Sequence, residues 1–159
     1  GGIHGTSMSQ VARRAGVATG TAYVHYESKE ELLIAAFVEI KESLGRTAMK
    51  DVSGTDEPRK MFARAWRNIH DFLRDDPVVA RFLLQVEASP LRGPAHDALG
   101  ANALTEAATT LEEHLVQLPA DLLYELGFSP AVRIVADGTG LSPTQLDTLI
   151  ESCWRAIRR

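Results

Sequence analysis

Apolar residues recur three and four positions apart along most of this chain, which is the spacing of one face of an α-helix. No window alternates between apolar and polar residues for long enough to indicate a strand. The pattern therefore predicts an all-α protein. The main helices are expected at residues 28–44, 58–74, 77–86, 94–117 and 142–157.

The amino-terminal part predicts two short helices around a tight turn. Ser7 and Gln10 have the spacing of a capping box, and they open a helix that is expected to end at Gly16. Glycine tolerates the left-handed backbone that such a corner needs. A second helix is expected from Ala18 or Thr19 to about Tyr26. A short, tightly connected helix pair of this kind commonly presents its second helix to a partner outside the protein.

Charge is distributed unevenly along the chain. The net charge is −4, which argues against non-specific nucleic-acid binding by the whole surface. Residues 1–26 contain Arg13 and Arg14 and no acidic side chain, so all 21 carboxylates lie in the remainder. A cationic end on an acidic body favours local contact of that end with a polyanion.

Composition places the chain among ordinary globular proteins, with 45% hydrophobic and 24% charged residues. No apolar run approaches the ~20 residues that a membrane-crossing helix needs, and no secretory signal is evident, so no membrane partner is expected. A single cysteine, Cys153, excludes an internal disulfide and fits a reducing cytoplasm. The polar segment 50–58 indicates a domain boundary, which gives predicted domains of 1–45 and 46–159.

The stretch TSMSQVARRAGVATGTAYVHYESKEELL, residues 6–33, resembles the DNA-binding segment of the TetR/AcrR family of transcriptional repressors. The resemblance is ungapped and includes the turn glycine and a second capping box, Ser28 with Glu31. It implies a helix-turn-helix domain followed by a helical domain for ligand binding and dimerisation. Family members have a further helix before this stretch, whereas only residues 1–5 precede it here, so a missing first helix is expected.

The resemblance also assigns DNA-contact roles. Thr21 and Tyr23 are expected to donate hydroxyl groups to phosphate oxygens, and Lys29 to reach phosphate from the start of the next helix. Two departures from the family pattern, Ala18 for serine and Thr19 for a basic residue, are expected to lower affinity. The complete predicted set is Ser7, Ala18, Thr19, Gly20, Thr21, Tyr23, His25 and Lys29.

Two further surfaces are implied by the resemblance. A pocket for a small, mostly apolar effector would be lined by facing apolar stripes, although the same residues suit a plain core: Trp66, Ile69, His70, Leu73, Phe82, Leu83, Val86, Leu104, Ala108 and Leu111. The last helix would form a homodimer interface, through Leu146, Ile150, Cys153, Trp154 and Ile157. The two-fold symmetry of such a dimer predicts a near-palindromic double-stranded DNA operator.

Two alternative functions remain beside this one. An enzyme is disfavoured because doublets such as His70-Asp71 and the run 112–114 do not have metal-ligand spacing. Adjacent helical residues also point about 100° apart. No catalytic residue, metal site or cofactor is therefore predicted. The second alternative is a helical ligand-binding or adaptor protein of the same fold that does not bind DNA specifically.

Overall fold

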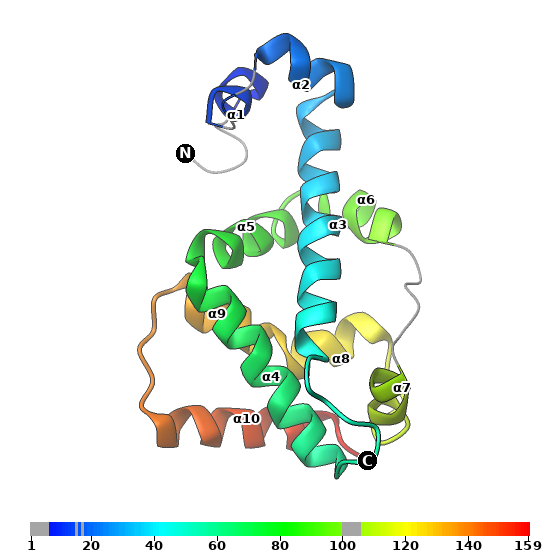
Figure 1. Cartoon of the computed structure of the whole chain (residues 1–159). Coiled ribbons are helices and arrows are strands. Elements are labelled where there is room, and N and C mark those ends of the chain that lie inside the picture. The colour runs from blue at the N-terminus through cyan, green and yellow to red at the C-terminus, as the bar shows by residue number, and fades with distance from the viewer. Residues whose placement is uncertain (1–6, 15, 17, 100–105) are drawn as a thin grey trace. The chain divides into compact units, whose positions relative to one another are not determined.

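A computed structural model describes residues 7–14, 16, 18–99 and 106–159, and within them every regular element is a helix (Figure 1). One isolated antiparallel bridge joins Leu115 to Arg158. The all-α prediction is therefore confirmed. The helices are α1 (Met8–Arg14), α2 (Thr19–His25), α3 (Lys29–Ala48), α4 (Pro58–Asp75), α5 (Pro77–Glu87), α6 (Arg92–Leu99), α7 (Glu106–Glu112), α8 (Ala120–Gly127), α9 (Ser129–Ala136) and α10 (Pro143–Ile157).

The chain divides into two compact units. Unit 1 comprises residues 1–41 and 82–101, and unit 2 comprises residues 42–81 and 102–159. Unit 1 thus combines the helix-turn-helix segment with α6 and the end of α5, which are distant in sequence. The predicted division into 1–45 and 46–159 is continuous in sequence and stays a prediction.

The capping residues and the turn glycine of the helix-turn-helix segment adopt the geometry that the sequence predicts. Ser7 Oγ accepts the Gln10 backbone N–H at 3.3 Å, and Gln10 Oε1 accepts the Ser7 N–H at 2.9 Å. Gly16 has a φ of 72°, in the left-handed region that favours glycine. Before α3, Ser28 Oγ accepts the Glu31 N–H at 3.1 Å. These contacts fix where each helix begins and where the chain turns.

Unit 2 is built around α4, which packs against α7, α9 and α10 (Figure 1). Trp66 is fully buried and its indole N–H donates to the Gly127 carbonyl at 3.1 Å. The Phe62 ring lies 4.9 Å from the Phe128 ring and 5.5 Å from the Trp154 ring, measured between centroids. An aromatic cluster therefore joins α4 to the end of α8 and to α10.

The expected helix over residues 94–117 differs from the structure at both of its ends. α6 already begins at Arg92, inside a segment expected to be a loop, and α7 ends at Glu112. The chain then leaves helical geometry because Leu115 pairs with Arg158 and the Val116 N–H donates to the Ile157 carbonyl at 2.7 Å. This pairing with a distant segment overrides the local helical pattern.

Candidate nucleic-acid interface

The second helix of the helix-turn-helix segment, α2, is mostly exposed. None of its seven residues is buried, and Tyr23 and Val24 retain 55% and 80% of their accessible surface. The helix before it, α1, packs on α2 and buries Met8 and Ala12. The segment is thus held by α1 while α2 presents side chains to solvent.

Hydroxyl and imidazole groups gather on this exposed helix. Thr21, Tyr23 and His25 are all exposed, and each carries a group that can donate a hydrogen bond to a phosphate oxygen. A buried position for Thr21 or Tyr23 would have excluded a DNA role, and neither is buried. Tyr26, expected to be mainly a core residue, is half-buried at the end of α2.

The front of α2 consists of small residues. Ala18 precedes the helix with extended backbone and provides no side-chain cap, Thr19 is half-buried, and Gly20 is exposed. A Cβ built at Gly20 meets no atom within 4 Å, so the space in front of its backbone is open. This surface allows close approach of a large flat partner such as the edge of a base pair.

Lys29, at the start of α3, lies among acidic neighbours. Its ammonium nitrogen is 4.0 Å from Glu30 Oε1, and its side chain is largely covered, with 22% of its surface accessible. Glu31 Oε2 accepts the Glu27 N–H at 2.6 Å, which stabilises the helix start. These carboxylates reduce the positive potential that Lys29 offers to a phosphate, and the acidic residues that directly follow Lys29 in the sequence are the signal for this effect.

Ser7 is exposed, but both of its capping groups are engaged. Because its backbone N–H already donates to Gln10, a phosphate contact through that N–H requires the capping bond to break. Ser7 is thus a less available phosphate donor than the residues of α2.

The residues predicted for an effector pocket are mostly buried, but some of them lie in unit 1 and others in unit 2. In unit 2, Trp66, Ile69, His70, Leu73 and Leu111 are buried and Ala108 is half-buried; in unit 1, Leu83 and Val86 are buried and Phe82 is half-buried. Leu104 lies outside the described residues. The assembly of this set into one pocket stays a prediction.

One pair in that set has defined geometry. The Trp66 and His70 rings are stacked with centroids 5.7 Å apart and planes 21° apart. His70 Nδ1 lies 3.3 Å from Asp71 Oδ1, so the imidazole also has a polar partner at the surface of α4.

The residues predicted for a dimer interface are largely internal to unit 2. Ile150, Cys153, Trp154 and Ile157 are buried within their own chain, and Leu146 is half-buried. Burial raises the pKa of the Cys153 thiol. Their contact with a second copy stays a prediction, because in the single chain these side chains form the core.

A row of exposed leucines was not singled out in the sequence. Leu118, Leu122 and Leu126 retain 41–46% of their surface and stand four residues apart at and along α8. A spacing of four places Leu122 and Leu126 on one face of α8, a signal that was present in the sequence, whereas Leu118 precedes the helix. Large apolar groups exposed in a row indicate a contact surface.

The described part of the chain contains no group of three His, Cys, Asp or Glu side chains arranged to hold a metal ion. No helix in that part is long and apolar enough to cross a membrane.

Two family profiles match the chain. Residues 1–36 match the profile described as "Bacterial regulatory proteins, tetR family", and residues 59–158 match the one described as "Tetracyclin repressor-like, C-terminal domain".

Individual proteins agree with these matches. An uncharacterized HTH-type transcriptional regulator of Haemophilus influenzae is 28% identical over 170 aligned positions, which cover 99% of this chain and 88% of that protein. A fatty acid metabolism regulator protein of Bacillus subtilis is 42% identical over 45 residues, 28% of this chain and 22% of that protein. These relatives are described as regulators rather than as enzymes.

Solved structures share the fold over nearly the whole chain. The crystal structure of a TetR-family transcriptional regulator from Haemophilus influenzae covers 98% of this chain and 87% of its own, with a TM-score of 0.75 and 27% identity. That of a TetR family transcription regulator from Marinobacter aquaeolei covers 96% of this chain and 85% of its own, with a TM-score of 0.70 and 21% identity.

Proposed function

This chain belongs to the TetR family of bacterial transcriptional regulators, and we propose that it is a repressor whose α2 enters the major groove of an operator. The observation that carries the proposal is the absence of any buried residue in α2, with Thr21 and Tyr23 open to solvent. A small, mostly apolar molecule bound in the C-terminal domain would release the operator.

The chemistry of α2 supports two kinds of DNA contact. The hydroxyl groups of Thr21 and Tyr23 suit phosphate oxygens, which fix the orientation of the helix on the duplex without reading sequence. The front of the helix, residues 18–20, offers a methyl group, a hydroxyl and an uncovered backbone to base edges. Open space at Gly20 lets the helix approach the groove closely.

Electrostatics limit the affinity of this surface. Thr19 stands where family members often have a basic residue, and Glu30 lies within 4.0 Å of the Lys29 ammonium group. Few cations therefore replace counterions on the phosphates, and the loss of affinity with added salt should be shallow. Specific base contacts would provide a correspondingly larger share of the binding free energy.

We propose that the protein acts as a homodimer on a near-palindromic site. Two-fold symmetry would place two copies of α2 roughly 34 Å apart, in successive major grooves on one side of the duplex. The exposed leucine row of α8 supports a contact between copies alongside α10. The protein would act in the cytoplasm, where its DNA target and a reducing environment for Cys153 coincide.

The effector is proposed to be apolar or aromatic. Buried apolar side chains dominate the predicted lining, and the Trp66–His70 stack adds one polar aromatic group that can orient a ligand. A thermal-shift screen with apolar and aromatic compounds tests this point, because a ligand that binds only the folded protein raises its melting temperature.

The DNA role is tested by a mobility-shift titration with the DNA upstream of the chain's own gene. Tyr23→Ala and Lys29→Ala should each weaken binding by about tenfold to a hundredfold, the scale of one lost hydrogen bond to a charged group. Lys60→Ala provides the matched control, since Lys60 is an exposed lysine of α4 in unit 2. Unchanged binding by both α2-region variants would favour the adaptor alternative.

A further inference from the structure

A polar groove of about 800 Å³ lies in unit 2, where α4 begins and α10 ends. Four arginines line it: Arg59, Arg155, Arg158 and Arg159. His114 and Trp154 complete the wall with an imidazole and an indole ring. This groove shares no residue with the predicted effector pocket, and it lies outside the helix-turn-helix segment.

The end of the chain is fastened in place beside this groove. The Arg159 backbone N–H donates to the His114 carbonyl at 3.0 Å, and its guanidinium Nε donates to the Leu115 carbonyl at 2.7 Å. With the bridge between Leu115 and Arg158, these bonds hold the two terminal arginines against the turn after α7. The cationic wall is therefore built by specific backbone pairing.

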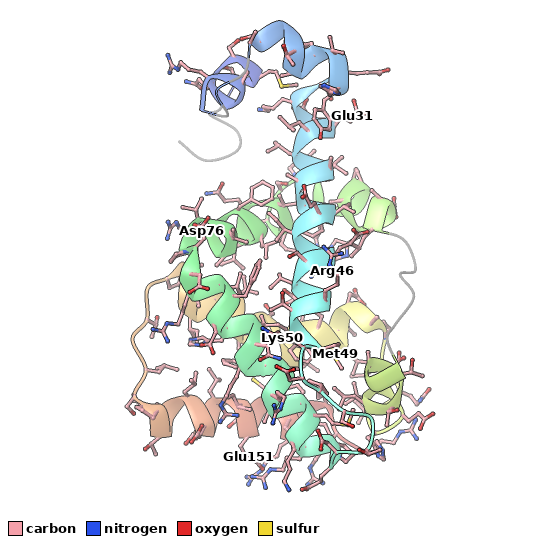
Figure 2. The ribbon with its side chains drawn as sticks, viewed as in Figure 1. Glu31, Arg46, Met49, Lys50, Asp76 and Glu151 are labelled. Atoms are coloured by element: carbon pink, nitrogen blue, oxygen red, sulfur yellow. The ribbon has the colours of Figure 1, made fainter. Side chains whose placement is uncertain are left out.

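The charges in the groove are only partly balanced. Glu151 on α10, labelled in Figure 2, is shared by two arginines, at 2.7 Å from Arg59 Nε and 2.8 Å from Arg155 Nε. Hydrogen bonds from Arg155 and Arg59 lower the pKa of Glu151. Arg158 is exposed and has no ion-pair partner among the residues that the structure describes.

Two more carboxylates, Glu57 and Glu113, also line the groove. Glu57 lies 3.8 Å from the Lys60 ammonium group, which is outside the lining. Four arginines and three glutamates thus line the groove, and Glu57 has a further cationic partner in Lys60. This concentration of arginine contrasts with a chain whose net charge is −4.

We propose that this groove binds a small phosphorylated molecule. The planar guanidinium group matches phosphate oxygens with paired hydrogen bonds, and a groove lined by four arginines suits the charge of a phosphate group. The volume exceeds that of a phosphate group, so the groove has room for the rest of the ligand. The binding is independent of the DNA contact proposed for α2.

Isothermal titration of the whole chain with inorganic pyrophosphate at low ionic strength tests the proposal. Arg158→Gln should weaken pyrophosphate binding by about tenfold, because one charge-assisted contact is lost. This variant removes no side-chain bond seen in the described part of the chain, so folding is expected to be intact. Arg64→Gln is the matched control, since Arg64 is an exposed arginine of α4 that does not line the groove.

A second variant should act in the opposite direction. Glu151→Gln removes the carboxylate that occupies Arg59 and Arg155, so it should tighten pyrophosphate binding by severalfold, with a circular dichroism spectrum to verify folding. The proposal is overturned if the unaltered protein does not bind pyrophosphate at millimolar concentration. It is also overturned if Arg158→Gln and Arg64→Gln bind equally well.

Discussion

The packing around Gly127 gives a prediction whose size follows from the structure. Gly127 ends α8, is buried, and accepts the indole N–H of Trp66 through its carbonyl. A Cβ added there would lie 2.8 Å from Ile157 Cδ1 and 3.5 Å from Phe62 Cε2. Gly127→Ala therefore places a methyl group against two fully buried side chains.

Two effects of opposite sign determine the outcome. Overpacking a filled core costs about 1–3 kcal/mol, whereas alanine in place of glycine in a helix contributes about 0.5–1 kcal/mol of stability. The net expectation is a destabilisation of about 1 kcal/mol, or about 2–4 °C in the melting temperature for a chain of this size. Thermal unfolding followed by circular dichroism measures it.

A matched control and a suppressor sharpen the test. Gly45→Ala in α3, where an added Cβ meets nothing within 4 Å, should raise stability by about 0.5–1 kcal/mol. Ile157→Val removes the Cδ1 atom that the new methyl group approaches, so the double variant Gly127→Ala with Ile157→Val should lose less stability than the sum of the two. The packing described around Gly127 would be refuted if the stability losses of the two single variants simply added in the double variant. It would also be refuted if the Gly127→Ala protein melted above the original.

Three further predictions address other parts of unit 2 and α5. Leu122→Glu should reduce the apparent mass in light scattering from that of the proposed dimer to that of a monomer, while Val78→Glu, at an exposed residue of α5, should not. A dimer in both variants would reject the leucine row as the contact. Glu151→Gln should lower the free energy of unfolding at pH 7, because neighbouring arginines depress the Glu151 pKa in the folded state. The difference in unfolding free energy between the original protein and the variant should disappear as the pH falls through that lowered pKa. Urea denaturation across pH measures this, and a difference that grows towards low pH would contradict it. Cys153 should react with iodoacetamide only as fast as the protein opens, because its thiol is buried; burial also raises the pKa of that thiol. Rapid labelling of the native protein would show the thiol to be accessible.

Local signals predicted much of the fold. The capping pairs Ser7–Gln10 and Ser28–Glu31 and the left-handed Gly16 depend on residues close in sequence, so their geometry follows from the amino-acid sequence alone. The all-helical class follows from apolar spacing for the same reason.

Features that depend on distant contacts could not be predicted in this way. α7 ends at Glu112 because residues 115–116 pair with the end of the chain, and no local pattern carries that information. The arginine groove arises from the same pairing.

The stripe on α10 illustrates a different limit. Helical spacing identifies an apolar face but not what covers it. Unit 2 itself buries Trp154 and Ile157, and the contact of this face with a second copy, which the family resemblance implies, stays a prediction. The leucines of α8 carry the same spacing and remain exposed.

The central claim, that α2 enters a DNA groove, is tested most directly by photocrosslinking. Cys153 is buried, whereas Val24 of α2 is 80% exposed, so a cysteine introduced as Val24→Cys accepts an azidophenacyl label selectively. Upon irradiation with operator DNA, the account predicts crosslinks at two positions about one helical turn apart, and none from Thr144→Cys on α10. Crosslinks from Thr144→Cys with none from Val24→Cys would contradict it.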